Sequence, residues 1–156
     1  MEKIALFPGS FDPFTTGHVA VVERGLAIFD RVVVGVGFNP GKHSLLSPHK
    51  RVSLIEQVFA GNDRVSVELY EGLTGDFCRS RGIRHILRGL RNSADFEYEQ
   101  TLDVANSRLY PEITTSVVFT PAEYIAVSSR LVREIISMGG DASLFLPAGI
   151  DITKYL

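Results

Sequence analysis

The stretch GSFDPFTTGH, residues 9–18, lies between a short apolar segment and a segment of helical period. Gly9 and Gly17 carry no Cβ atom, so the backbone of this loop can approach a phosphate closely. The helix that follows offers free N–H groups and the positive end of its dipole to the same anion. The stretch therefore predicts a phosphate-binding turn that joins a β-strand to an α-helix.

The polar side chains of this stretch carry the candidate chemistry. His18 falls in the first turn of the predicted helix, where its imidazole can donate a hydrogen bond to a phosphoryl oxygen while charge shifts at phosphorus. Ser10 adds a hydroxyl to the same site, and Asp12-Pro13 stiffens the turn that presents both groups. A purely structural role for His18 at the start of a helix stays open at this point.

Short β-branched runs alternate with longer runs of helical period along the rest of the chain. Such alternation is typical of βαβ units, which build a doubly wound parallel sheet. We predict an α/β fold with a single five-stranded parallel sheet. Its five strands, all expected to be buried, are Lys3–Phe7, Arg31–Gly37, Arg64–Leu69, Arg84–Leu87 and Thr115–Thr120.

Start and stop signals for a helix follow each predicted strand. Five helices are expected, with N-caps at Thr16, Ser47, Thr74 and Ser128 and one start near Ser93. The third helix is expected to end at Gly82 and the last long one at Met138–Asp141. The predicted inner face of the fourth helix consists of Tyr98, Leu102, Ala105 and Leu109.

Size and charge limit the class of protein. With 156 residues, 45% of them hydrophobic, the chain suits one globular domain, residues 1–156, that buries roughly 70% of its unfolded surface. A net charge of −2 does not indicate non-specific binding to nucleic acid or to an acidic membrane. Any anion site must therefore be local.

The sequence also indicates where the protein works. The longest apolar run, Val32–Phe38, is far shorter than the ~20 residues that cross a bilayer, and the amino terminus lacks the pattern of a secretory signal. Cys78 is the only cysteine, so no intrachain disulfide can form, and no Cys/His set has the spacing of a zinc site. We expect a cytoplasmic protein without a membrane partner.

Ligands bind beyond the carboxyl ends of the strands in an open parallel sheet. The loops that follow the first, second, fourth and fifth predicted strands are polar and rich in glycine. They are Gly9–His18, Asn39–Lys42, Arg88–Arg91 and Pro121–Arg130. We predict one site where these four loops converge.

Several of these segments resemble a known family. Thr15-Thr16-Gly17-His18, with GSFDP directly upstream, is similar to the T/HxGH signature of the nucleotidyltransferases that share ancestry with class I aminoacyl-tRNA synthetases. ILRGLR at 86–91, DFEYE at 95–99 and VSS at 127–129 resemble motifs of the bacterial phosphopantetheine adenylyltransferase family. The resemblance covers essentially the whole chain and implies a Rossmann-like nucleotidyltransferase fold.

The resemblance also implies a reaction in coenzyme A biosynthesis. Members of this family reversibly transfer the adenylyl group of ATP to 4'-phosphopantetheine, which gives 3'-dephospho-coenzyme A and pyrophosphate, with Mg²⁺ as the assisting ion. The family forms homohexamers and is inhibited by coenzyme A, so both properties are expectations for this chain. No residue is assigned to a metal, and no nucleic acid partner is expected.

Cations are needed on both sides of the α-phosphorus, because two polyanions must meet with their reacting atoms ~3 Å apart. Lys42 lies on a Pro-Gly turn, and Arg88 ends a strand, where its planar fork can grip a phosphate. By resemblance, both bind the acceptor, and Arg91 binds the ATP phosphates beside His18. The expected catalytic residues are Ser10, His18, Lys42 and Arg91. The expected acceptor-binding residues are Ser10, Lys42, Leu73, Thr74 and Arg88.

The resemblance further implies a set of ATP-binding residues. They are Ser10, Phe11, His18, Gly89, Leu90, Arg91, Glu99, Tyr124, Ile125, Ala126, Val127, Ser128, Ser129 and Arg130. Structural alternatives stay open for several of them: Glu99 as a solvated carboxylate stacked above Asp95, and the two serines as a helix cap. Leu73-Thr74 would equally suit a helix staple and cap. Arg130 departs from the serine or threonine of many relatives, so it either adds a cation or changes the contact.

Other reaction classes fit this sequence less well. A dinucleotide-dependent oxidoreductase needs GxGxxG after its first strand, and the string Gly35–Pro40 lacks the third glycine. A P-loop kinase needs GxxxxGK[ST], which does not occur. Two alternatives stay open, namely a T/HxGH nucleotidyltransferase with another phosphorylated acceptor and a non-catalytic nucleotide-sensing module.

Overall fold

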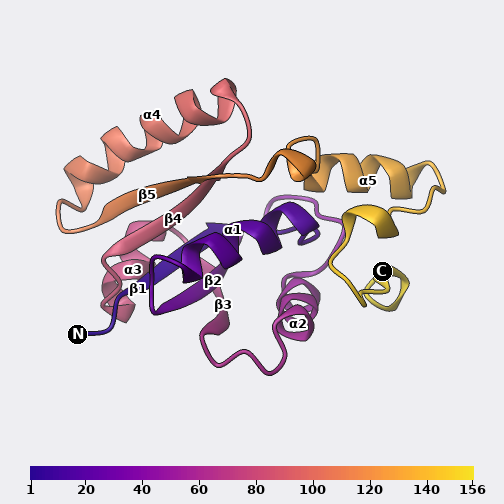
Figure 1. Ribbon diagram of the computed structural model, residues 1–156, viewed down its shortest axis with the longest axis horizontal. Coiled ribbons are helices and arrows are strands. Elements are labelled where there is room, and N and C mark those ends of the chain that lie inside the picture. Colours follow the sequence, from indigo (N-terminus) through magenta and orange to yellow (C-terminus); the bar gives the residue numbers. More distant parts are fainter.

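Five parallel strands form one sheet in the order β3-β2-β1-β4-β5, as the computed structural model of residues 1–156 shows (Figure 1). The strands are β1 (Ile4–Gly9), β2 (Arg31–Phe38), β3 (Val65–Glu71), β4 (His85–Leu90) and β5 (Thr114–Phe119). The α-helices are α1 (Thr16–Leu26), α2 (Pro48–Val58), α3 (Thr74–Arg81), α4 (Ser93–Leu109) and α5 (Ser129–Ser137). Short 3-10 turns occur at Ala122–Tyr124, Ser143–Phe145 and Ile152–Lys154. The predicted doubly wound α/β fold is confirmed.

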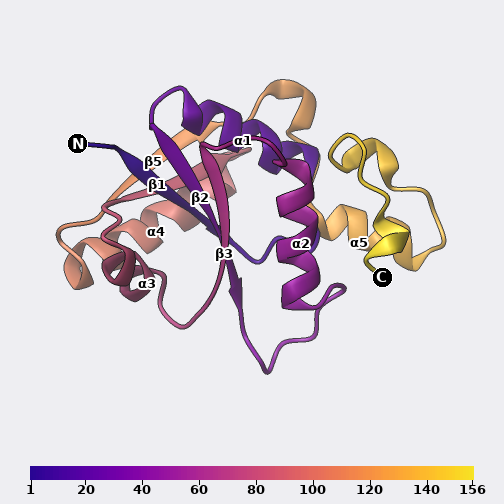
Figure 2. The ribbon, with the colours of Figure 1, turned by 90° about the horizontal axis from the view of Figure 1, so that it is seen from below.

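The helices cover both faces of the sheet because successive side chains of each strand point to opposite sides. Ala5 and Phe7 of β1 belong to a cluster with buried residues of α1 and α2, whereas Leu6 belongs to a second cluster with Phe77 and Cys78 of α3. Figure 2 shows α1 and α2 on one side of the strands and α3 and α4 on the other. None of these helices is both long and apolar enough to span a bilayer.

The prediction that all five strands are buried is wrong for the two edge strands. Every residue of β3 from Val65 to Tyr70 is only half-buried, and Phe119 of β5 is 74% exposed. Each edge strand has only one neighbour in the sheet, so its outer edge is left open to solvent. The predicted inner face of α4 is also wrong, because Tyr98, Leu102, Ala105 and Leu109 are all exposed.

Two predicted caps lie one residue from their true positions. The N-cap of α1 is Thr15 and not Thr16, because the Thr15 side chain accepts a bond from His18 N and the His18 ring accepts one from Thr15 N. Thr74 does not cap α3, since its hydroxyl is bonded to Tyr70 instead and Leu73 holds the cap position. Ser47 and Ser128 do cap α2 and α5, and Gly82 ends α3 in the left-handed conformation, as predicted.

Strand β4 extends three residues beyond its predicted end. Arg88, Gly89 and Leu90 pair in register with Val117, Val118 and Phe119 of β5, so they belong to the sheet and not to a loop. A Cβ atom on Gly89 would lie 2.4 Å from a methyl group of Val21 in α1. The lack of a side chain at this position lets the middle of α1 lie directly against the end of β4.

Buried polar contacts fix the loop that joins β1 to α1. The Asp12 carboxylate is 5% exposed and accepts bonds from the backbone N–H groups of Leu45 and Leu46, each at 2.8 Å. From α2, the buried Arg51 donates to the Ser10 carbonyl at 2.6 Å. The loop is therefore tied to two segments that lie far from it in the sequence.

Replacing Asp12 by alanine tests the contribution of its two hydrogen bonds to stability. The substitution leaves two inward-facing N–H groups without an acceptor, which should lower the free energy of unfolding by about 2–4 kcal/mol. Urea unfolding followed by circular dichroism measures the change. Asp63→Ala serves as the control, because Asp63 is exposed and its side chain makes no hydrogen bond; an Asp12→Ala variant as stable as this control would contradict the role given to Asp12.

Candidate active site

A cavity of about 420 Å³ opens at the carboxyl ends of β1 and β4, the two strands between which the sheet order reverses. Open α/β sheets bind their ligands at this position. The cavity wall brings together many of the residues that the sequence singles out. They are Ser10, Phe11, His18, Arg88, Gly89, Arg91, Glu99, Val127, Ser128, Ser129 and Arg130.

The His18 ring is held in one orientation by its neighbours. Its Nδ1 accepts a hydrogen bond from the Thr15 backbone N–H at 3.0 Å, and the Phe11 and Phe14 rings lie 5.0 Å from it, centroid to centroid. An Nδ1 that accepts a bond carries no proton, so the proton of the neutral ring is on Nε2. His18 is therefore a fixed hydrogen-bond donor in the cavity wall.

The charge state of His18 follows from the same surroundings. Burial, together with the nearby cations Arg91 and Arg88, lowers the pKa of the imidazole to about 3. Both causes disfavour a positive charge on the ring. The ring is neutral at physiological pH, so it can donate a hydrogen bond but cannot act as a cationic acid.

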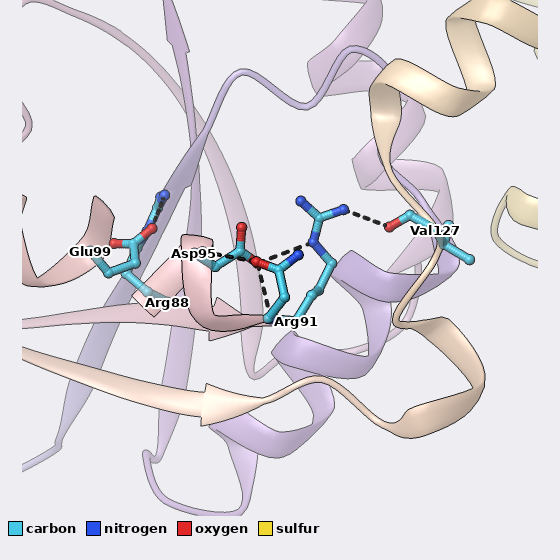
Figure 3. A network of polar contacts seen from close by, with 6 residues as sticks. Arg88, Arg91, Asp95, Glu99 and Val127 are labelled. Atoms are coloured by element: carbon cyan, nitrogen blue, oxygen red, sulfur yellow. Dashed lines mark hydrogen bonds and ion pairs between the residues drawn. The ribbon is translucent and has the colours of Figure 1, made fainter. Parts of the chain in front are cut away.

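Arg88 and Glu99 form an ion pair in the cavity wall. Nε and Nη2 of Arg88 both donate to Oε1 of Glu99, at 2.9 and 2.6 Å, and Nη1 donates to the Pro8 carbonyl at 2.6 Å. Glu99 is 7% exposed, so it is not the solvated carboxylate that its place on the helix also allowed. The pair connects α4 to the end of β4 (Figure 3).

Arg91 forms a second ion pair, with Asp95, which lies one turn before Glu99 on α4. Asp95 Oδ2 accepts from the backbone N–H of Arg91 at 2.9 Å and from its Nε at 3.3 Å. Nη1 of Arg91 then donates to the Val127 carbonyl at 3.3 Å, which links β4 to the loop before α5 (Figure 3). Arg91 therefore lies between two walls of the cavity.

The start of α5 forms the opposite wall. The Ser128 hydroxyl accepts from Leu131 N at 3.1 Å, and the Ser129 hydroxyl donates to the Pro13 carbonyl at 2.7 Å. Both serines thus have structural roles in addition to their place at the cavity. Arg130 projects outward, with its side chain 84% exposed and only a 3.4 Å contact to Glu134.

The structure leaves several predicted site residues outside this cavity. Lys42 is exposed on the turn after β2 and lines neither of the two main cavities. Leu73 is 60% exposed, and Thr74 lines only the second cavity. The other predicted residues that line neither cavity are Leu90, Tyr124, Ile125 and Ala126.

The second cavity, of about 390 Å³, adjoins the first. The two share Ser10, Arg88, Tyr98 and Glu99 in their walls. Residues from β3, α3 and α4 complete the second one, among them Tyr70, Thr74, Leu102 and Asn106. This arrangement offers one compartment beside the phosphate-binding loop and another that reaches away from it.

Arg133 is a cavity residue that the sequence reading missed. It lines the first cavity and donates from Nη1 to the Asp12 carbonyl at 2.9 Å. Arg133 lies three residues after Arg130, so the two share one face of α5. This spacing is the signal in the sequence that could have identified Arg133. Asp95 and Tyr98, both within the DFEYE segment, also line the cavity.

The carboxylates near the cavity do not form a protein-only metal cage. No group of three or more His, Cys, Asp or Glu side chains lies close enough together to hold a metal ion. Asp95 and Glu99 are each paired with an arginine. The chemistry that this wall supports directly is therefore the binding and charge stabilisation of phosphate groups.

Comparison with known proteins places this geometry in context. The chain matches the cytidylyltransferase-like family over residues 6–135. It superimposes with a TM-score of 0.71 on a bifunctional NMN adenylyltransferase/ADP ribose pyrophosphatase from Francisella tularensis, solved with AMP and a manganese ion. The two are 17% identical, and the match covers 97% of this chain but 46% of that one, so it shows a shared fold over about half of that protein.

Relatives of similar length are much more alike. The phosphopantetheine adenylyltransferase of Anaeromyxobacter sp. (strain K) is 44% identical over 150 residues, which are 96% of this chain and 92% of that protein. The protein of the same name from Phocaeicola vulgatus is 45% identical over 148 residues, 95% of this chain and 97% of that protein. The chain therefore belongs to the phosphopantetheine adenylyltransferase family.

Proposed function

We propose that this chain transfers the adenylyl group of ATP to 4'-phosphopantetheine, which gives 3'-dephospho-coenzyme A and pyrophosphate. An oxygen of the acceptor phosphate bonds to the α-phosphorus, and the bond from that phosphorus to the oxygen leading to the β-phosphate breaks. The reverse reaction follows the same path. The observation that carries the proposal is the placement of His18, Arg88 and Arg91 around one cavity where the sheet order reverses.

The two adjoining cavities suit the two substrates. The first, between the phosphate-binding loop and the start of α5, takes ATP and the phosphate end of the acceptor. The second, with Tyr70, Leu102 and Asn106 in its wall, takes the pantetheine arm, which has both apolar and amide groups. Arg88 lines both cavities, so it can bind the acceptor phosphate at the point where they meet.

His18 acts as a neutral hydrogen-bond donor in this reaction. The acceptor phosphate is already ionised, so the displacement requires no general base. Nε2–H of His18 donates to an α-phosphate oxygen, on which negative charge accumulates as the bonds to phosphorus change. The hydrogen bond from Thr15 N to Nδ1 fixes this donor before the substrates bind.

Arg91 and the start of α5 hold the outer phosphates of ATP. The Arg91 guanidinium lies between Asp95 and the Val127 carbonyl, next to the N-terminus of α5. Arg133 in the same wall adds a cation, and Arg130 is free to turn toward the leaving pyrophosphate. Lys42 is exposed on the turn after β2, so its contact with the acceptor requires this turn to move inward.

Mg²⁺ supports the reaction as a companion of ATP. Because Asp95 and Glu99 are paired with arginines, the phosphate oxygens of the nucleotide would be the ligands of this ion. The ion offsets the phosphate charge. By family resemblance, the working form is a cytoplasmic homohexamer, and coenzyme A is its feedback inhibitor.

Pyrophosphate release tests the proposed reaction directly. Purified protein with ATP, 4'-phosphopantetheine and Mg²⁺ should release pyrophosphate and form 3'-dephospho-coenzyme A. Replacing ATP by CTP, or the acceptor by nicotinamide mononucleotide or phosphocholine, should give no comparable rate. Folded protein that is inactive with ATP and 4'-phosphopantetheine would rule the proposal out, and activity with another pair would redirect it to that acceptor.

His18→Ala should reduce kcat by about 10²–10³-fold, because it removes one fixed donor to the charge that develops at phosphorus. Steady-state kinetics at saturating concentrations of both substrates measures the effect. His49→Ala is the matched control, since His49 is exposed and lies outside both cavities. A His18→Ala variant that folds and keeps kcat within tenfold of the wild type would refute the role of His18.

The low pKa of His18 should also appear in the pH dependence of stability. The unfolded chain binds a proton at His18 below about pH 6.5, whereas the folded chain does not until about pH 3. Stability should therefore fall as the pH drops through this window. Between pH 7 and pH 5, His18→Asn should lose about 2 kcal/mol less free energy of unfolding than the wild type, as measured by urea unfolding. Equal losses in both proteins would mean that the folded imidazole titrates normally.

A further inference from the structure

The Arg88–Glu99 pair lies where the two cavities meet, and both residues line both cavities. Glu99 is the only buried residue of α4, a helix whose other side chains are half-buried or exposed. A carboxylate is costly to bury unless a cation and hydrogen bonds compensate it. Arg88 supplies both, which explains why this one side chain of α4 points inward.

The bonds within the pair fix the plane of the Arg88 guanidinium. Glu99 Oε1 accepts from Nε and Nη2, so it occupies one edge of the planar fork, and the Pro8 carbonyl accepts from Nη1. A guanidinium has five N–H donors. Three are used here, so two remain, one on each terminal nitrogen. Two such donors can bind a phosphate at the junction of the cavities in a bidentate manner.

We infer that Glu99 is a positioning residue for the phosphate of the acceptor, and that it acts through Arg88. It holds the guanidinium so that the two remaining N–H groups face the acceptor phosphate. This inference deepens the proposed function and rests on it. It also differs from the sequence-based expectation, in which Glu99 contacts ATP.

A parallel pair on the same helix provides an internal comparison. Asp95 holds Arg91, whose Nη1 donates to the Val127 carbonyl in the loop before α5 and which does not line the second cavity. Two carboxylates of α4 thus hold two different arginines (Figure 3). In the proposed function, one of these arginines lies on the acceptor side and the other on the nucleotide side. Substitutions at Glu99 and Asp95 should therefore affect different substrates.

The contribution of the acceptor phosphate can be isolated by calorimetric titration with 4'-phosphopantetheine and with pantetheine. The ratio of the two Kd values measures the preference for the phosphate. Glu99→Ala should lower this preference about tenfold, the scale of one charge-assisted hydrogen bond, with little change in the Kd of ATP. Glu99→Gln keeps an acceptor oxygen for Arg88 and should retain the preference to within about threefold. Asp95→Asn should weaken ATP binding instead.

A double-mutant cycle tests whether Glu99 acts through Arg88. In an Arg88→Ala background, Glu99→Ala should cause no further loss of phosphate preference, because the residue that it positions is gone. Independent losses at the two positions would overturn the inference, as would a rise in the Kd of ATP with the preference intact. Wild-type protein that does not prefer the phosphorylated compound would refute the proposed function and the inference together. Circular dichroism verifies that each variant is folded. If Glu99→Ala does not fold, Glu99→Asp replaces it in the cycle, because the shorter side chain withdraws the carboxylate from Arg88.

Discussion

The carbonyl groups of the turn between β1 and α1 cannot be left unbonded inside the protein, and the site depends on how this constraint is met. The Ser10 carbonyl accepts a hydrogen bond from Arg51 of α2. The Asp12 carbonyl accepts one from Arg133 of α5, and the Pro13 carbonyl accepts one from the hydroxyl of Ser129. These three donors come from helices that are distant in the sequence. One short turn thereby sets the positions of α2 and of α5, and the start of α5 lines the phosphate cavity.

The electrostatics of the cavity follow from which charges are compensated. Arg88 and Arg91 each have a carboxylate partner, whereas Arg133 in the same wall bonds only to a carbonyl. The cavity therefore keeps a positive potential for phosphate in a chain whose net charge is −2. Burial, together with the cations Arg91 and Arg88, lowers the pKa of His18 and keeps its imidazole neutral.

Local patterns in the sequence were enough to predict the α/β fold, the starts of all five α-helices to within one residue, and the loop that carries His18. They did not predict the exposure of β3 and β5, because position at the edge of a sheet depends on the strand order. The pairing of Glu99 with Arg88 spans 11 residues and a change from strand to helix, so no local period encodes it. The bonds from Leu45 and Leu46 to Asp12 likewise join segments more than 30 residues apart, so no local pattern encodes them.

The shared wall between the two cavities separates the selection of the acceptor from the chemical step. Leu102 and Asn106 line only the compartment away from the phosphate-binding loop, whereas His18 and Arg91 line only the compartment beside it. Side chains in the outer compartment can therefore vary without disturbing the reacting phosphates. In evolution or in engineering, a new acceptor tail could be recruited to an unchanged reaction centre, provided that it still ends in a phosphate.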